Sequence, residues 1–217
     1  RPKQTLEDWE DELKEAIWLA RGHLSLYQLT IEQGTRYFDL QTAGKLTIPG
    51  EDLAADFYEL TQELTAAAGL PAYEISNHAR PGQESEHNML YWRYGEYAGI
   101  GPGAHGRLMI NNQRHATADE KLPFEWQKHV LAKGHGMVVD DVLTWEEQGD
   151  EFLVMGLRLK EGISPARFTA LSGRQINPAQ IAALKGYGFV ETLPNGNLRV
   201  TDRGWPVLDA VVADLAA

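Results

Sequence analysis

Residues Tyr73 to Arg107 read YEISNHARPGQESEHNMLYWRYGEYAGIGPGAHGR. This stretch contains three of the seven histidines, five aromatic side chains and six glycines. A helix or strand that only packs in a core shows a regular apolar period, which is missing here. Glycines allow the backbone to approach a ligand closely, and the polar and aromatic groups between them can hydrogen-bond, stack or coordinate. The stretch therefore predicts a ligand-handling region, with an ordinary long loop as the alternative.

The composition of the 217-residue chain restricts its partners and its chemistry. Acidic side chains outnumber basic ones by 31 to 20, and the formal net charge of −11 disfavours nucleic acid or an anionic membrane as the main partner. We see no apolar run long enough for a transmembrane helix and no signal peptide, so we expect a cytoplasmic protein. The chain has no cysteine, which excludes disulfides, zinc ribbons, iron–sulfur clusters and catalytic thiols built by this chain alone.

The first third of the chain predicts helices alternating with strands. Thr5 and Asp8 form a capping box for an amphipathic helix that ends near Arg21-Gly22. The segment 23–31 is apolar on both faces, which is typical of a strand in a parallel sheet. After a long loop we expect a helix around Leu53 to Leu64 and a strand at 72–76. This order of elements is typical of β/α repeats, in which ligands bind at the carboxyl ends of the strands.

The remainder of the chain predicts a hairpin and then a small helical module. We expect a glycine-interrupted strand at 97–110, a tight turn at Asn111-Asn112, a helix at 123–133 and a connection at 134–142. Helices then start at Thr144 (a capping box with Glu147), Ser164-Pro165 and Asn177-Pro178, and a hairpin turns at Pro194-Asn195-Gly196 before a last helix at 205–215. Three helices, a hairpin and a closing helix describe a winged-helix-like module.

Four motifs in order, HLSLYQLTIEQGT, YEISNHARPG, HNMLYW and GIGPGAHG, resemble the radical S-adenosylmethionine (SAM) proteins of the oxygen-independent coproporphyrinogen III oxidase (HemN-like) family. Within it they are most similar to the HemW-type heme chaperone branch, because HNxxYW is that branch's signature. The resemblance runs from the QTLEDW helix to the small C-terminal module.

The resemblance implies an α/β (α+β overall) fold: the C-terminal half of a partial β/α (TIM-like) barrel, followed by a winged-helix-like domain. On this basis we expect residues 1–118 to belong to the barrel, 119–143 to be a connecting helix and linker, and 144–217 to form the winged-helix-like domain. The family's CxxxCxxC motif, which holds a [4Fe-4S] cluster that cleaves SAM, is missing here. We therefore expect a C-terminal portion of a longer protein, inactive in radical chemistry without the missing N-terminal barrel half.

The heme chaperone resemblance implicates His87 in binding heme iron. Imidazole nitrogen is a good iron ligand, and the flanking Tyr91 and Trp92 can cover a porphyrin face. The predicted heme site consists of His87, Asn88, Tyr91, Trp92, Arg93 and Arg80, with the two arginines paired to propionates and His87 as the metal ligand. The alternatives are purely structural roles for the same residues. His87 would then be a hydrogen-bonded structural histidine, the aromatic residues would belong to the core, and the arginines would be solvated or paired locally.

The same resemblance places SAM near other residues of this chain. The backbone of Gly103, Ala104 and His105 would approach the adenine or methionine moiety, and the glycines would leave room for it. A bulged edge strand is the alternative explanation for these glycines. Gln28, Thr30 and Ser76 are the other predicted SAM residues, and hydrogen-bonding roles inside a barrel are their alternative.

The resemblance implies two alternative functions, and the winged-helix-like pattern suggests a third. The first is a heme chaperone that binds heme or porphyrin and delivers heme to respiratory hemoproteins, meeting membranes only through those recipients. The second is an oxygen-independent coproporphyrinogen III oxidase of porphyrin metabolism, which shares the fold and cofactors. The third is a winged-helix nucleic-acid-binding module, which the few basic residues between 177 and 215 disfavour.

Overall fold

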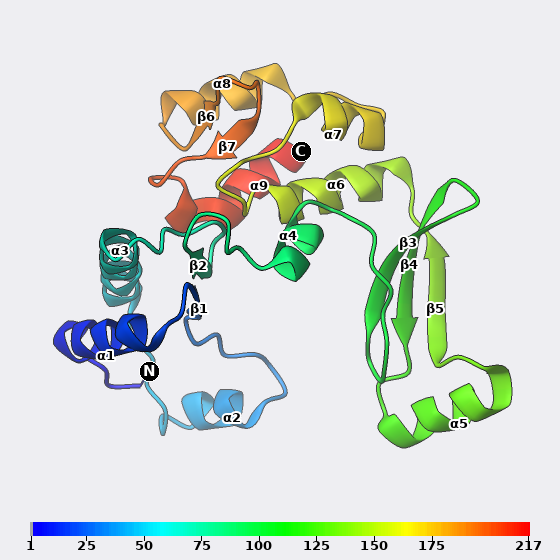
Figure 1. Cartoon of the computed structure of the whole chain (residues 1–217), viewed down its shortest axis with the longest axis horizontal. Helices are drawn as coiled ribbons and strands as arrows, with labels where there is room; N and C mark the ends of the chain where they lie inside the picture. Colours follow the sequence, from blue (N-terminus) through cyan, green and yellow to red (C-terminus); the bar gives the residue numbers. More distant parts are fainter. Residues whose placement is uncertain (1) are drawn as a thin grey trace. The chain divides into compact units, whose positions relative to one another are not determined.

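The computed structural model describes residues 2–217 and divides into two compact units, Arg1–Ser85 (unit 1) and Glu86–Ala217 (unit 2) (Figure 1). Arg1, the first residue of the predicted barrel portion, lies outside the described residues. The division falls after Ser85 because the residues of each unit mainly contact other residues of the same unit. The domain boundaries expected at 118 and 143 rest on composition and family resemblance, and they stay predictions.

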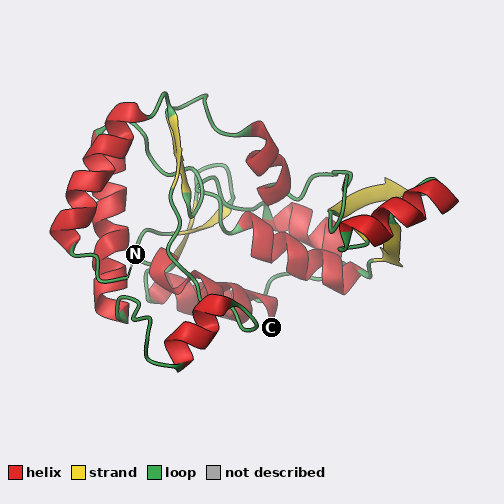
Figure 2. Ribbon diagram, turned by 90° about the horizontal axis from the view of Figure 1, so that it is seen from below, coloured by secondary structure: helices red, strands yellow, loops and turns green. Residues whose placement is uncertain are grey.

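Unit 1 is built on two long helices that lie side by side (Figure 2). The predicted capping box is confirmed: the N–H of Asp8 donates to Thr5 Oγ1 and the N–H of Thr5 donates to Asp8 Oδ2. In chain order the elements are α1 (Leu6–Leu19), β1 (His23–Ser25), α2 (Arg36–Thr42), α3 (Glu51–Ala67) and β2 (Asn77–Ala79). The helix α2 lies inside the segment that we expected to be a loop.

The expected parallel pairing of the strands is wrong. β1 and β2 pair antiparallel, with Leu24 opposite His78. The segment 71–79 folds back on itself, because the N–H of Tyr73 donates to Asn77 O at 3.1 Å and the N–H of Ala79 donates to Pro71 O at 3.1 Å. The arm that returns from this turn, and not the expected strand at 72–76, lies beside β1. It therefore runs in the opposite direction to β1.

Unit 2 begins with a short helix and a three-stranded sheet in the order β3-β4-β5. The turn at Asn111-Asn112 is confirmed, and both residues adopt the left-handed conformation that asparagine tolerates better than most residues. The predicted connection at 134–142 is instead largely strand β5, which pairs with β4. The elements are α4 (Glu86–Trp92), β3 (His105–Ile110), β4 (Gln113–Asp119), α5 (Pro123–Lys133) and β5 (Met137–Val142).

The rest of unit 2 is a helical module closed by a hairpin. Its core is apolar, and the side chains of Leu153, Leu157 and Phe168 in it are fully buried. The predicted capping box of Thr144 with Glu147 and the predicted hairpin are both confirmed. The elements are α6 (Trp145–Gly156), α7 (Pro165–Ser172), α8 (Pro178–Gly186), β6 (Val190–Thr192), β7 (Leu198–Val200), a short 3-10 helix η1 (Trp205–Val207) and α9 (Leu208–Ala216).

The fold class is therefore mixed α/β with small sheets, and all strand pairs in the sheets of residues 2–217 are antiparallel. Within the same residues, no helix combines the length and the apolar character that crossing a membrane requires.

Candidate functional site

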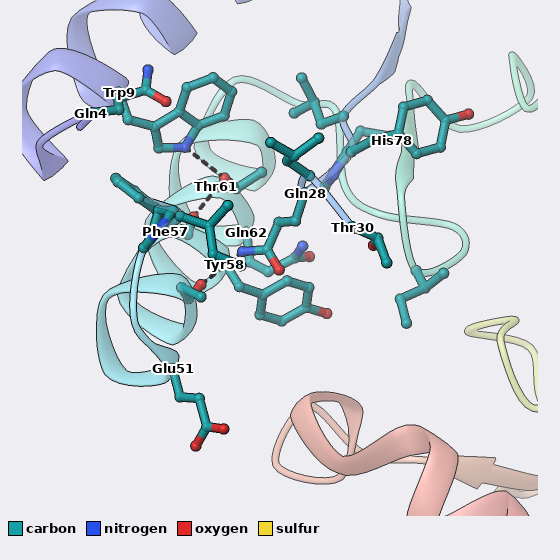
Figure 3. A pocket seen from close by; sticks show the side chains of 17 residues that line it. Gln4, Trp9, Gln28, Thr30, Glu51, Phe57, Tyr58, Thr61, Gln62 and His78 are labelled. Atoms are coloured by element: carbon teal, nitrogen blue, oxygen red, sulfur yellow. Dashed lines mark hydrogen bonds between the residues drawn. The ribbon is translucent and has the colours of Figure 1, made fainter. Parts of the chain in front are cut away.

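A cavity of about 360 Å³ lies in unit 1 beside the segment that follows β1 (Figure 3). Two of the predicted SAM residues, Gln28 and Thr30, line it. The side-chain amide of Gln28 donates to the backbone oxygen of Ala54 on α3 at 2.7 Å, which fixes one end of that amide. Among the side chains that line the cavity, Glu51 is the one acid and there is no lysine or arginine. The polar part of the wall therefore consists mainly of neutral amides, hydroxyls and aromatic rings.

The back wall of this cavity is held by a chain of hydrogen bonds from α1 to α3. The indole N–H of Trp9 donates to Thr61 Oγ1 at 2.9 Å, and the hydroxyl of Thr61 donates to Phe57 O at 2.7 Å (Figure 3). One turn later Thr65 Oγ1 lies 3.0 Å from Nδ1 of His78 on β2. The wall is therefore held by hydrogen bonds, and it is built from both long helices of unit 1.

The third SAM candidate of unit 1, Ser76, belongs to a buried turn. Its backbone N–H and its hydroxyl both lie 3.1 Å from Oε1 of Glu74, which also accepts from the amide of Asn77. Glu74 is fully buried, and its second oxygen, Oε2, has no hydrogen-bond partner. Ser76 thus acts in the structure as part of the turn that reverses the chain between 74 and 77.

The HNMLYW motif forms most of α4 in unit 2, a helix that the sequence patterns did not predict. His87 and Tyr91 are four residues apart, so they share one face of this helix. Their rings meet edge to face with centroids 4.7 Å apart, and the ring of Tyr91 lies 4.1 Å from that of Tyr97. His87 is exposed, whereas Asn88, Tyr91 and Trp92 are half-buried. The structure therefore brings an accessible imidazole onto a row of aromatic rings.

The two arginines expected beside heme propionates behave differently. Arg93 donates through Nε and Nη2 to both carboxylate oxygens of Glu161, each at 2.7 Å. Arg80 belongs to unit 1, where it is exposed after β2 and its backbone N–H donates to Gly22 O at 2.9 Å. The local pairing that was the alternative for Arg93 is present in the structure.

Tyr94, directly after α4, is the centre of a polar network that sequence reasoning missed. Its hydroxyl donates to Glu151 Oε2 on α6 at 2.8 Å, and its ring lies under the guanidinium of Arg114 at 4.0 Å. Burial, and then the hydrogen bond to Glu151, raise the pKa of the Tyr94 phenol above its usual value. Arg107 on β3 also binds Glu151, with Nη2 to Oε1 at 2.6 Å, and this hydrogen bond raises the pKa of the Arg107 guanidinium.

A second group of contacts covers the carboxyl end of α4. Arg167 of α7 donates to the backbone oxygens of Arg93 at 2.7 Å and Tyr94 at 3.2 Å. Arg114 of β4 donates to the oxygen of Tyr94 at 3.3 Å. These carbonyl oxygens belong to the two residues directly after α4, and cations are favourable near the carboxyl end of a helix. The two arginines thus tie the segment after α4 to α7 and β4.

A cleft of about 350 Å³ opens next to α4, between the segment after it, β3 and α6. Tyr91, Tyr94 and Tyr97 line it, together with Val154 and Met155 of α6. The sequence carried one usable signal for this cleft: Glu151, Val154 and Met155 have the three- and four-residue spacing of a single helix face. The partner of that face was not visible in the sequence.

The remaining SAM candidates, Gly103, Ala104 and His105, lie together where β3 begins. The glycines that flank them have a packing explanation. A Cβ at Gly99 would lie 2.6 Å from His105 O, and one at Gly106 would lie 2.5 Å from Thr117 Oγ1. Close packing against neighbouring segments thus explains these two glycines without any ligand, although β3 pairs with β4 without the bulge that was the alternative.

The donor atoms of this chain do not fit an iron–sulfur cluster, because the sequence has no cysteine. Among residues 2–217, no group of three or more His, Asp or Glu side chains could hold a metal ion. An exposed histidine beside aromatic rings does fit an iron porphyrin, in which the macrocycle supplies four ligands and the protein supplies an axial one.

Residues 143–207 match the HemN C-terminal domain family. The mitochondrial radical S-adenosyl methionine domain-containing protein 1 of Danio rerio is 36% identical over 221 residues, covering 97% of this chain and 50% of that protein. The heme chaperone HemW of Bacillus subtilis is 35% identical over 184 residues, covering 85% of this chain and 48% of that protein. The chain spans about half the length of these curated relatives.

The solved structure of coproporphyrinogen III oxidase (HemN) from Escherichia coli, described as a radical SAM enzyme, matches 100% of this chain and 52% of its own, with a TM-score of 0.73. At 16% identity this likeness shows the fold alone. The sequence relatives and the matched C-terminal domain show that the chain belongs to the HemN-like family of radical SAM proteins, on the side of the HemW-type heme chaperones, and corresponds to a C-terminal portion of such proteins.

Proposed function

We propose that this chain is the heme-binding portion of a HemW-type heme chaperone, and that heme is a cargo destined for respiratory hemoproteins. Support comes from the name of the Bacillus subtilis relative, heme chaperone HemW. The observation that carries the proposal is the exposed imidazole of His87 at the start of α4, with the ring of Tyr91 against it at 4.7 Å.

In this proposal His87 is the axial ligand of the heme iron, because neutral imidazole has a lone pair for iron and an exposed ring leaves room for a macrocycle. Tyr91 and Trp92 contact the porphyrin face, and Asn88 supplies a polar group on the same helix. Arg93 would have to leave Glu161 to bind a propionate. That pair is about half exposed, so exchanging one carboxylate for another costs little.

The cofactors of radical chemistry belong to the longer protein in this proposal. The [4Fe-4S] cluster takes its ligands from outside the chain, since the chain has no cysteine. Gln28, Thr30 and Ser76 in unit 1, and Gly103, Ala104 and His105 in unit 2, are the proposed contacts to SAM. The neutral wall around Gln28 and Thr30 suits an adenosyl group better than a phosphate, because no lysine or arginine lines that cavity.

The finer description of the fold is also part of the proposal. Residues 1–118 would correspond to the end of a β/α barrel and 144–217 to a winged-helix-like domain. Residues 119–143 would be the connecting helix and linker, which contain α5 and also strand β5. The likeness to HemN over the whole chain supports this division. A nucleic-acid role has little support, because Arg199, the basic residue of the β6–β7 hairpin, donates to Glu191 at 2.8 Å.

The proposal is tested by titrating ferric heme into the 217-residue chain and following the Soret band. We expect His87→Ala to weaken binding about tenfold or more and to change the spectrum, because an axial bond is lost. His135→Ala is the matched control, since His135 is an exposed histidine of the same unit outside α4. An unchanged spectrum and affinity in His87→Ala would remove His87 as the ligand.

A further inference from the structure

We propose that the cleft beside α4 takes the vinyl-bearing edge of protoheme and discriminates against porphyrins that carry a propionate on every pyrrole ring. This inference rests on the proposed function, because it requires the iron to be at His87. It assigns the cleft a role in specificity, whereas His87 alone would accept any iron porphyrin.

The cleft is continuous with the proposed iron site through one side chain. The ring of Tyr91 lies 4.7 Å from that of His87 between centroids. Tyr91 also lines the cleft, where the ring of Tyr97 is tilted against it at 4.1 Å. A porphyrin is wider than one aromatic side chain. A macrocycle bound at His87 on the Tyr91 side therefore extends one edge toward the cleft, whose volume of about 350 Å³ suits such an edge.

The walls of the cleft are chiefly apolar or aromatic. Val154 and Met155 line it from α6 with an aliphatic and a thioether side chain, and three tyrosines add aromatic rings. Vinyl and methyl substituents gain from leaving water in such surroundings. Thioether sulfur and aromatic rings also make favourable contacts with flat π systems.

The charged groups that line the cleft are already paired. Arg107 binds Glu151 through Nη2 at 2.6 Å and through Nε at 3.0 and 3.2 Å, while its Nη1 donates to Gly106 O at 2.9 Å. Asp150, the other acid of the lining, accepts from Arg174 Nη2 at 2.5 Å. The arginine that lines the cleft is therefore already neutralised by Glu151, so an entering carboxylate would gain little from it.

Hydrogen bonds from phenols do not change this outcome. Tyr94 gives its hydroxyl to Glu151. Burial raises the pKa of the Tyr97 phenol, so this side chain stays neutral at physiological pH. A neutral donor compensates only part of the cost of moving a carboxylate out of water. The cleft is thus selective for an uncharged edge.

Protoheme and coproporphyrin differ in this property. Protoheme carries its two propionates on neighbouring pyrrole rings, so the opposite edge bears only vinyl and methyl groups. Coproporphyrin III carries four propionates, one on each ring, so every edge is anionic. The first can insert an uncharged edge while its propionates stay in water, whereas the second must bury a carboxylate or stay out of the cleft.

The test compares ferric protoheme with the ferric complex of coproporphyrin III, each titrated into the full chain. We expect the chain to bind protoheme about tenfold or more tightly than the tetrapropionate. Val154→Lys places a cation at the cleft. It should strengthen binding of the tetrapropionate and so lower the ratio of the affinity for protoheme to that for the tetrapropionate. Leu131→Lys on α5 is the matched control with the same charge change, and it should keep the wild-type ratio. Both positions are exposed, at 41% and 82%, so both variants should fold.

Equal affinities of the wild-type chain for the two porphyrins would overturn the inference, and so would an unchanged ratio in Val154→Lys. The His87→Ala variant separates this failure from failure of the proposed function. Binding that depends on His87 but does not distinguish the porphyrins would refute only the role of the cleft. Protoheme binding that is indifferent to His87 would refute the proposed function, and the inference with it.

Discussion

Glu151 connects three segments of unit 2, so its substitution should lower the stability of all three. Its single carboxylate joins three segments, because it accepts from the Tyr94 hydroxyl after α4 at 2.8 Å and from Arg107 on β3 at 2.6 Å, while belonging to α6. The side chains of Glu151 and Arg107 are only 27% and 21% exposed, so water replaces their bond poorly. We predict that Glu151→Gln loosens all three segments together.

The magnitude follows from what glutamine retains. Its one amide oxygen can keep the Tyr94 hydroxyl or one guanidinium bond, and the charge of Arg107 then lacks a partner. Hydrogen bonds to charged groups contribute about 1.5–3 kcal/mol each, so we expect a loss of about 2–3 kcal/mol. Glu146→Gln is the matched control on the same helix, because Glu146 is exposed in its first turn, and it should cost about 0.5 kcal/mol.

Hydrogen exchange is the suitable assay, because it reads the local free energy of opening without assuming that both units unfold together. A loss of 2–3 kcal/mol corresponds to protection roughly 30- to 150-fold lower for the amides of α4, β3 and α6. Unit 1 should keep its protection. The reasoning is refuted if protection in those three elements changes by less than about twofold, or if it falls equally in Glu146→Gln.

Two further predictions concern packing and pH. A Cβ at Gly149 would lie 2.5 Å from the Cβ of Ser172, so Gly149→Ala should lower the free energy of unfolding in urea by about 1–3 kcal/mol. At Gly186 a Cβ meets nothing within 4 Å, so Gly186→Ala should raise this free energy by about 0.5–1 kcal/mol. Equal urea midpoints for the two variants would contradict this prediction. Because the pKa of Tyr94 is raised on folding, its contribution to stability is complete below about pH 10 and is lost as pH rises from there toward the folded pKa. Tyr94→Phe should therefore lose less stability than the wild type as the pH rises from about 10 to about 12, and parallel loss in both proteins would count against the assignment.

Local signals in the sequence predicted the local structure well. The capping boxes at Thr5 and Thr144, the asparagine turn and the hairpin after Leu193 all appear where their residue types require them. These features depend on contacts within a few residues, so the sequence contains the whole interaction. The helix at 123–133 matches for the same reason, with proline at its start and glycine after its end.

Pairing between distant segments was less predictable. The apolar run 23–31 indicated a strand buried on both faces, yet only His23–Ser25 pairs, because the turn around Glu74 presents the returning arm to it. Strand β5 was missed because its residues MVVDDV are mostly exposed and lack a period of two. In both cases the partner across the sheet determines the strand, and that partner is not adjacent in sequence.

The candidate site shows the same division. HNMLYW was recognised as a motif from its residues, and the structure adds that it is a helix with His87 and Tyr91 on one face. The contacts of Glu151 with β3 and with the end of α4 join residues 44 and 57 positions apart, and no local pattern indicates them. The role of His87 itself stays a prediction until heme is bound to it.

Chemical rescue of a His87→Gly variant tests the central claim most directly. The variant should lose the Soret spectrum of the histidine-ligated ferric heme, and millimolar free imidazole should restore it by occupying the space that the side chain left. Imidazole should have no such effect on a His135→Gly control, whose spectrum should already match the wild type. A His87→Gly spectrum that equals the wild type without imidazole would show that His87 is not the heme ligand.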